Sequence, residues 1–295
     1  MSDLILLTRE TQIADRKVGR LAYGCWRFAG SDLAAAQAKV EAALSIGANV
    51  LDTAAIYGFG AEGFGDAEAR LGDLFASQPG LRDQVAVVTK GGIVPPEPYD
   101  SRAASLIESA ENSLRRLRSE QVELFLIHRP DNLAHPAEMA EALTELRDSG
   151  KIAEAGVSNF SPAQLSALQA HLDFPLAATQ PEISLSRTEP LFDGVLDQAM
   201  ELGVLPMAWS PLGGGALMTG SGPICTALDR IAGENGADRG AVALAWLLAH
   251  PAGIMPIIGS QNPDRIRAAG AAFDLKMTRR DWYALLEASL GHKMP

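Results

Sequence analysis

The chain has 295 residues, 47% of them hydrophobic and 21% charged, so it is long enough to bury a large core. Its formal net charge of −11 favours solubility and disfavours a nucleic-acid partner, which would need a basic face. The only two cysteines, Cys25 and Cys225, exclude a disulfide framework and a zinc cluster. Both thiols are interpreted as buried apolar groups, although Cys25 lies beside a candidate pocket.

The N-terminal residues, MSDLILLTRETQ, are too short and too charged for a signal peptide. No apolar run approaches the roughly 20 residues that are needed to span a membrane. We therefore expect a cytoplasmic protein that has no membrane partner. No pattern in the sequence indicates an oligomer, and a monomer is the default expectation.

A repeating unit runs along the chain, in which a short apolar run is followed by a turn and then by an amphipathic segment rich in alanine and leucine. Eight apolar runs are predicted to be strands: 21–26, 48–53, 85–90, 122–128, 152–159, 176–183, 204–210 and 254–260. Helical patterns lie between them, for example at 32–47 and at 135–150, where Gly150 is a usual helix stop.

Three segments fall outside the simple repeat. Residues 4–20 are predicted to form a β-hairpin ahead of the first strand. Segment 222–250 holds two helical patterns where one is expected, and a last helix is predicted at 278–291.

Strands that alternate with helices predict right-handed βαβ units and a parallel sheet. Eight such units close into a (β/α)8 TIM barrel, which typically takes ~250 residues. We expect one barrel domain over residues 1–295, with an N-terminal hairpin and an extra C-terminal helix. An open, doubly wound sheet is the alternative, and the strand count favours the barrel.

Gly58, Gly60 and Gly63 match the dinucleotide-binding fingerprint G-x-G-x-x-G. In a true fingerprint the first glycine turn directly follows a strand, and an acidic residue ends the next strand about 20 positions on. Here the strand-like run ends near Ala54, and the next run, VAVVTK, ends in a lysine. We therefore interpret these glycines as part of a loop.

Polar residues end three successive apolar runs. Asp52, Lys90 and His128 are spaced one barrel unit apart, and Tyr57 lies in the loop that follows Asp52. Because βα loops converge at the C-terminal face of a barrel, these four side chains are expected at one rim. Each alone would more often be a cap, a packing residue or a solvated charge, so the prediction depends on their combination.

Together the four side chains are predicted to form a proton-transfer group. A tyrosine hydroxyl has an ordinary pKa of about 10, and a neighbouring ammonium is expected to lower it. Asp52 would keep a buried Lys90 protonated, and His128 would offer an N–H to a substrate oxygen.

The sequence resembles the aldo-keto reductases nearly from end to end. The motifs that carry the resemblance are LDTAAIYG (51–58), VVTKGG (87–92), LFLIHRPD (124–131), GVSNFSPAQL (156–165), TQPEIS (179–184), AWSPLGGGAL (208–217) and PIIGSQNPDRI (256–266). The HRPD and AWSPLGGG forms look like one bacterial branch of that family.

The resemblance implies a role for each matching residue. Asp52, Tyr57, Lys90 and His128 match the catalytic tetrad, with Tyr57 as the general acid in carbonyl reduction. The other matches are cofactor contacts: Ser158, Asn159 and Gln180 to the nicotinamide carboxamide, Trp209 stacked on the nicotinamide ring, Ser210, Pro211, Leu212, Gly213 and Gly214 around the pyrophosphate, and Gly259, Ser260 and Arg265 near the adenosine phosphate.

The chain departs from the family pattern at three places. Gly259 replaces a common lysine, Ala268 and Ala269 replace a frequent Glu-Asn pair, and Pro181 replaces a small aliphatic residue. The first two departures weaken the expected contacts to the adenine end of the cofactor.

The resemblance implies an NADP(H)-dependent oxidoreductase that reversibly reduces an aldehyde or ketone to an alcohol, with NADPH preferred over NADH, and it implies no metal. Trp26, Phe59 and Tyr99 are candidates for the wall of the pocket that binds the small carbonyl substrate. The alternative is a non-catalytic, NADP(H)-binding redox-sensing regulatory subunit, which should have a degraded tetrad. A metal-dependent barrel lyase or hydrolase would need a carboxylate or histidine cluster at the rim, but strands five to eight end in Asn, Gln, Ser and Ser.

Overall fold

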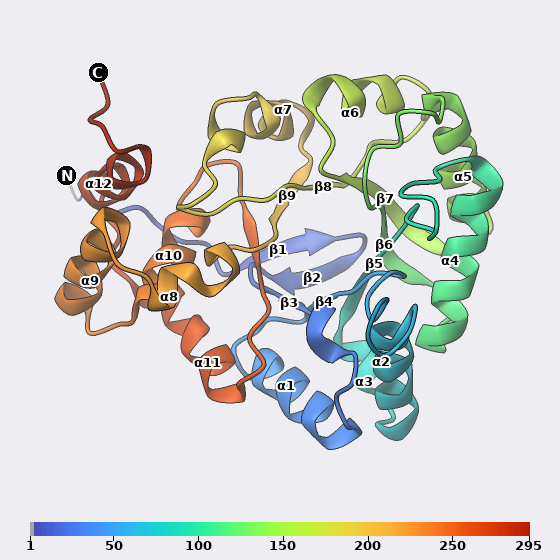
Figure 1. The fold of residues 1–295 in the computed structure, drawn as a ribbon, viewed down its shortest axis with the longest axis horizontal. Helices are drawn as coiled ribbons and strands as arrows, with labels where there is room; N and C mark the ends of the chain where they lie inside the picture. The colour runs from blue at the N-terminus through green and yellow to red at the C-terminus, as the bar shows by residue number, and fades with distance from the viewer. Residues whose placement is uncertain (1–2) are drawn as a thin grey trace.

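A closed barrel of eight parallel strands forms the centre of the protein, in a computed structural model that describes residues 3–295 (Figure 1). The order around the barrel is β10-β3-β4-β5-β6-β7-β8-β9. The strands are β3 (Ala22–Gly24), β4 (Val50–Asp52), β5 (Ala86–Gly91), β6 (Val122–Ile127), β7 (Ile152–Ser158), β8 (Ala178–Gln180), β9 (Leu205–Ala208) and β10 (Met255–Ile258). Each strand lies within one residue of its predicted apolar run, and the barrel prediction is confirmed.

The helices lie around the outside of the barrel (Figure 1). They are α1 (Leu33–Ser45), α2 (Asp66–Ser77), α3 (Leu81–Gln84), α4 (Ala103–Leu117), α5 (Pro136–Asp148), α6 (Pro162–Gln169), α7 (Val195–Leu202), α8 (Ala216–Thr219), α9 (Pro223–Asn235), α10 (Arg239–Leu248), α11 (Pro263–Ala268) and α12 (Arg279–Leu290). Short 3-10 turns are η1 (Trp26–Phe28), η2 (Glu189–Leu191), η3 (Gly213–Gly215) and η4 (Ala269–Asp274).

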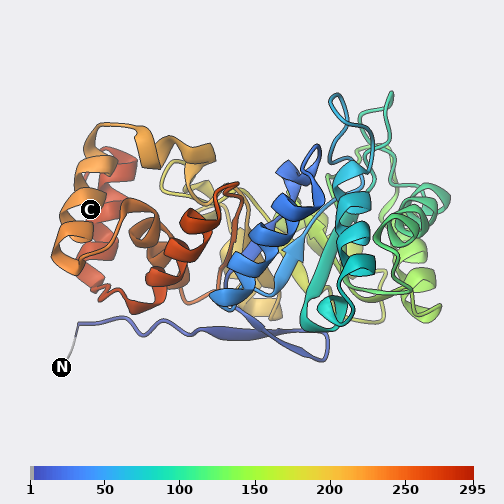
Figure 2. The same ribbon diagram turned by 90° about the horizontal axis from the view of Figure 1, so that it is seen from below.

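Local signals start several helices where the sequence predicts them. Asp32 caps α1 by accepting a hydrogen bond from the backbone of Ala35, and Thr278 caps α12 in the same way. The two helices expected in 222–250 are α9 and α10. They pack with α12 on one side of the barrel, as Figures 1 and 2 show. Among residues 3–295, no helix is long and apolar enough to cross a membrane.

A β-hairpin lies across one end of the barrel, as Figure 2 shows along its lower edge. It consists of the antiparallel strands β1 (Glu10–Ile13) and β2 (Arg16–Gly19). Ile13 and Val18 are buried against the side chains that fill the barrel interior. This end is therefore closed by apolar packing.

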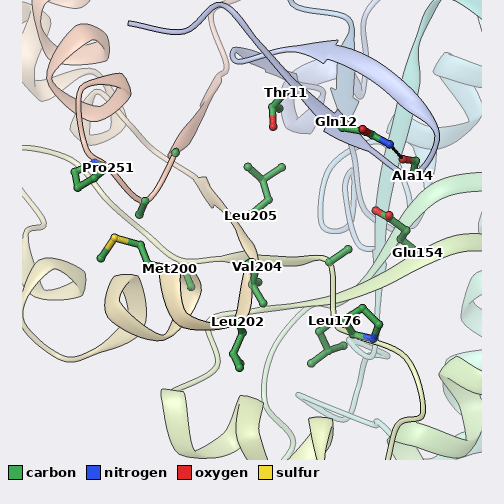
Figure 3. Close-up of a pocket in the computed structure, with 16 residues that line it drawn as sticks. Thr11, Gln12, Ala14, Glu154, Leu176, Met200, Leu202, Val204, Leu205 and Pro251 are labelled. Atoms are coloured by element: carbon green, nitrogen blue, oxygen red, sulfur yellow. Dashed lines mark hydrogen bonds between the residues drawn. The ribbon is translucent and has the colours of Figure 1, made fainter. Parts of the chain in front are cut away.

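A groove of about 700 Å³ lies between the hairpin and the segments that lead into β8, β9 and β10 (Figure 3). Its walls include Gln12, Met200, Leu205 and Pro251, and one carboxylate, Glu154, lies at its edge. Glu154 belongs to the first half of β7, so the groove lies away from the ends of the strands that carry the polar residues described next.

Candidate active site

The strand register brings the polar residues to one rim of the barrel. Asp52 is the last residue of β4 and pairs with Val88 of β5, two positions before Lys90. His128 directly follows β6, and its backbone N–H donates to the carbonyl oxygen of Gly91. Because parallel strands end at the same edge, side chains separated by tens of residues in sequence meet there.

Lys90 is the centre of the cluster. Its ammonium nitrogen lies 2.7 Å from Oδ2 of Asp52, 2.8 Å from the carbonyl oxygen of Thr53 and 3.2 Å from the hydroxyl oxygen of Tyr57. The Lys90 side chain is completely buried, at 0% exposure. The ring of Tyr57 packs edge-on against the imidazole of His128, with 5.9 Å between ring centroids. The four side chains singled out from the sequence are thus in one contact group.

Burial and neighbouring charges shift the pKa values of Lys90 and Tyr57 in opposite directions. Burial lowers the pKa of Lys90, but Asp52 and Tyr57 outweigh it and raise that pKa above its ordinary value, so the ammonium stays charged. Burial raises the pKa of Tyr57 above its ordinary value, although Lys90 acts to lower it. The expectation that the neighbouring ammonium would give Tyr57 a lowered pKa is therefore wrong, because the loss of hydration exceeds the attraction of the charge.

The environment keeps His128 and Cys25 uncharged. Burial lowers the pKa of His128 to about 2, and the positive charges of Lys90 and Arg129 act in the same direction. A neutral imidazole has one N–H donor and one acceptor nitrogen. Cys25 is 0% exposed, and burial raises its pKa, so the thiolate that reactive cysteines require is strongly disfavoured.

Gln180 makes a contact that the sequence did not indicate. Its Nε2 donates to Oδ1 of Asp52 over 2.8 Å, while Oδ2 of the same carboxylate is held by Lys90. Both ends of this hydrogen bond are buried. Sequence resemblance assigned Gln180 to the cofactor alone, because nothing in the spacing of the two residues relates them.

Next to the cluster, Ser158, Asn159 and Trp209 form a hydrogen-bonded chain. Ser158 Oγ donates to the carbonyl oxygen of Gln180 over 2.8 Å, and Asn159 Nδ2 donates to Ser158 Oγ over 2.8 Å. The indole N–H of Trp209 donates to Oδ1 of Asn159 over 3.0 Å. The guanidinium of Arg129 lies over the Trp209 ring, 5.7 Å from its centroid. The amide and the indole are thereby fixed relative to each other.

A loop with left-handed backbone follows β9. Ser210, Gly213, Gly214 and Gly215 all have positive φ, which favours glycine at three of these positions. Pro211 of this loop is buried and Leu212 is half-buried. The G-x-G-x-x-G stretch, in contrast, is a turn between β4 and α2, and the helix starts only at Asp66. Its interpretation as a loop is confirmed.

A second loop connects β10 to α11, over residues 259–262. Asn262 caps α11, and its backbone N–H donates to Oγ of Ser260. A Cβ added at Gly259 would meet no atom within 4 Å, so the missing side chain leaves open space. On α11, Arg267 pairs with Asp264, whereas the exposed Arg265 guanidinium has no hydrogen-bond or ion-pair partner in the part of the chain described.

Three aromatic residues at the ends of loops are exposed to solvent. Trp26 is 62% exposed, Phe59 58% and Tyr99 41%. They follow β3, β4 and β5 respectively, so they belong to loops on the same side as Tyr57. Phe59 packs edge-on against Phe64 within its own loop. The aromatic ring contacts found within residues 3–295 include none between any two of the three, and their pocket role stays a prediction.

Comparison with known proteins identifies a family. The model of the "Aldo/keto reductase family" matches residues 20–289. A 6-dehydroglucose reductase from Novosphingobium aromaticivorans is 48% identical over 100% of both chains. A 6-dehydroglucose reductase from Agrobacterium fabrum is 43% identical over 94% of this chain and 96% of its own. The oxidoreductase YdhF of Escherichia coli is 40% identical over 94% and 95%.

Solved structures share the fold. A glycerol dehydrogenase from Gluconobacter oxydans superimposes with a TM-score of 0.84 at 26% identity, over 98% of this chain and 96% of that one. An aldo-keto reductase from Klebsiella pneumoniae in complex with NADPH gives a TM-score of 0.80 at 25% identity, over 99% and 97%.

Proposed function

This chain belongs to the aldo/keto reductase family of oxidoreductases, and we propose that it is an NADPH-dependent enzyme that reversibly reduces an aldehyde or ketone to an alcohol. The observation that carries this proposal is the buried Lys90 ammonium, which bonds both Asp52 and the Tyr57 hydroxyl. When bound, NADPH supplies the hydride, a chemistry that no side chain offers. The protein supplies the binding site, the orientation and the proton.

In the proposed reaction Tyr57 is the general acid. Its raised pKa keeps the hydroxyl protonated near neutral pH, which is the state needed to donate a proton to a carbonyl oxygen. The phenolate left behind is stabilised by the Lys90 ammonium, and Asp52 balances the charge of Lys90. Lys90 and Asp52 therefore act by keeping one positive charge beside the oxygen that loses the proton.

His128 would bind the substrate oxygen as a hydrogen-bond donor. Because its pKa is lowered to about 2, the imidazole stays neutral and does not compete with Tyr57 as an acid. Its ring lies edge-on to the Tyr57 ring, so both polar groups belong to one side of the rim. A neutral N–H donor at this position would polarise the carbonyl by a hydrogen bond without transferring a proton to it.

The residues present fit NADPH. The Ser158, Asn159 and Trp209 chain offers amide and hydroxyl groups beside a flat ring, which suits a carboxamide on an aromatic base. The left-handed loop from Ser210 to Gly215 leaves backbone groups accessible near the position proposed for the pyrophosphate. The exposed Arg265 guanidinium suits a phosphate, because its planar fork donates two parallel hydrogen bonds.

For the substrate, we propose a sugar that carries an aldehyde in place of its primary alcohol, such as 6-dehydroglucose, reduced to the parent sugar. The support is the name shared by two relatives at 48% and 43% identity over nearly the whole of each chain. Exposed aromatic faces such as Trp26 and Tyr99 would offer apolar contact to the C–H face of a sugar ring.

The test follows oxidation of NADPH by absorbance across a panel that contains 6-dehydroglucose, simple aldehydes, ketones and polyols. We expect the sugar aldehyde to give the highest kcat/KM, and NMR should identify glucose as the product. A protein that binds NADPH but turns over none of the panel would contradict the enzymatic proposal and favour the regulatory alternative. Equal rates with all aldehydes would contradict the proposed substrate but not the proposed reaction.

A further inference from the structure

Lys39 is a buried cation that is hydrogen-bonded to two neutral side chains. It belongs to α1, is only 7% exposed, and its ammonium donates to Oγ of Ser31 over 2.8 Å and to Oε1 of Gln261 over 2.7 Å. Both partners are neutral. No Asp or Glu lies within ion-pair distance of Lys39 in the region 3–295. A desolvated charge that is held only by neutral oxygens is costly, so this position calls for an anion.

The surroundings of Lys39 contain one acid, one thiol and one aromatic ring. The ammonium lies 5.5 Å from the centroid of the Phe28 ring, which attracts a cation weakly. Burial lowers the pKa of Lys39, while the negative charge of Asp32 acts to raise it. Asp32 uses its carboxylate to cap α1, where it accepts from the backbone N–H of Ala35. The charge of Lys39 is therefore only partly neutralised.

Gln261 places this charge at a specific loop. It directly follows Ser260 in the loop 259–262, which the proposed function assigns to the phosphate of the adenosine. Helices α1 and α11 lie side by side, as Figures 1 and 2 both show, and Lys39 joins the first to the loop that precedes the second. Tyr23 holds the same loop by donating to the carbonyl oxygen of Ser260.

The same loop lacks a cation of its own. Gly259 stands where the resemblance leads one to expect a lysine, and a Cβ built there meets no atom within 4 Å. Steric conflict therefore does not explain the glycine. With a net charge of −11, the protein has no general attraction for a phosphate, so a positive charge has to be supplied locally.

We propose that Lys39 is a further cofactor-binding residue, whose ammonium supplies from beneath the loop 259–262 the positive charge that favours the 2′-phosphate of NADPH. Two of its three N–H groups are used by Ser31 and Gln261, both half-buried, so the charge lies close to the surface of the loop. This inference rests on the proposed use of NADPH. The competing role is a structural tie between α1 and the loop.

Binding measurements separate the two roles without any turnover. Dissociation constants for NADPH, NADH, adenosine 2′,5′-bisphosphate and adenosine 5′-monophosphate are measured by calorimetry for wild type, Lys39→Met and Lys39→Gln. Loss of the charge should weaken NADPH and the bisphosphate about tenfold or more, and should change NADH and the monophosphate less than about twofold. Lys276→Met, which removes an exposed lysine between η4 and α12, is the control for net charge and should bind all four like wild type.

A second-site change completes the test. Gly259→Lys fits into open space, and in the Lys39→Met or Lys39→Gln background it should restore selectivity for the 2′-phosphate. If the Lys39 variants bind all four compounds equally more weakly, or as tightly as wild type does, the inference is overturned. It is also overturned if wild type binds NADPH and NADH with the same affinity. Lys39→Gln keeps a polar group toward Ser31 and Gln261, so it serves if the methionine variant does not fold. Wild type that binds the bisphosphate but reduces no carbonyl would contradict the proposed function while leaving this inference standing.

Discussion

Gln180 and Asp52, 128 residues apart in the sequence, are joined by a buried hydrogen bond of 2.8 Å from Nε2 to Oδ1. Since Lys90 binds the other oxygen of the same carboxylate, Gln180 fixes the plane in which Asp52 faces the ammonium. A residue at the end of β8 thereby positions a residue at the end of β4, which lies on the opposite side of the barrel.

Gln180→Leu should destabilise the protein and slow the reaction together. Removing the donor leaves a buried carboxylate oxygen unpaired, which costs about 1–3 kcal/mol of unfolding free energy. Urea unfolding measures the loss, and steady-state reduction should show a lower kcat. Gln37→Leu, which removes a surface hydrogen bond to Glu41, is the matched control and should change neither quantity appreciably. Full stability of the Gln180 variant would show that Asp52 does not depend on this contact.

Tyr57→Phe should lower the rate of carbonyl reduction by about 100-fold or more, because the proposed general acid is removed. The dissociation constant of NADPH should stay close to the wild-type value. Both are measured on the same samples, by steady-state kinetics and by fluorescence titration. Tyr283→Phe on α12 removes a hydroxyl remote from the cluster and should behave like wild type. Turnover near the wild-type rate in the Tyr57 variant would rule out its role as the acid.

The two directions of the reaction should depend differently on pH. In the proposed mechanism reduction needs protonated Tyr57, whose pKa is raised from its ordinary 10.0, so kcat/KM for reduction should be nearly flat between about pH 6 and 9. Alcohol oxidation needs the phenolate and should rise with pH over the same range. Lys90→Met removes the charge that opposes the effect of burial, so the pKa of Tyr57 should rise further and the rising limb of oxidation should move to higher pH. An unmoved limb would mean that Lys90 has no electrostatic effect on Tyr57.

His128 should make the fold sensitive to acid. Its pKa falls from 6.5 in the unfolded chain to about 2 in the folded protein, so below pH 6.5 the unfolded state binds the extra proton. The unfolding free energy should therefore fall by about 1.4 kcal/mol per pH unit from this residue alone as the pH drops from about 6 to 4.5.

His128→Gln should remove that part of the slope, as measured by urea unfolding at several pH values. The surface variant His171→Gln is the matched control for loss of an imidazole. His250, whose pKa is also lowered by burial, should account for part of the slope that persists. An identical slope in wild type and His128→Gln would mean that His128 takes up a proton in the folded protein.

Arg265→Ala should weaken NADPH by ~1.5–3 kcal/mol and hardly change NADH, because one charge-assisted contact to a phosphate is lost. Arg267→Ala on the same helix is the matched control, since that guanidinium is already paired with Asp264. Calorimetric titration gives both constants. Equal weakening of the two cofactors, or tighter binding of NADH by wild type, would contradict the role of Arg265.

The barrel was predictable because its signals are local. Each apolar run is a strand, and the polar residue at its end marks the rim, as with Asp52 and His128. The direction of the pKa shift of Tyr57 was not predictable, since it depends on how completely the folded chain excludes water from the hydroxyl. The burial of Lys39 was not predictable either, because the sequence of α1 does not distinguish a buried lysine from one on a solvated helix face.

The hairpin that covers one end of the barrel determines from which end small molecules can reach the cluster around Lys90. Ile13 and Val18 close that end with apolar packing, so the approach to the cluster around Lys90 lies at the opposite end, at the mouth framed by the βα loops. In the proposed reaction, the substrate, the product and the proton that returns to Tyr57 would all pass through this mouth. A molecule lodged across the mouth therefore delays the escape of whatever lies deeper, and residence times at the two depths are linked.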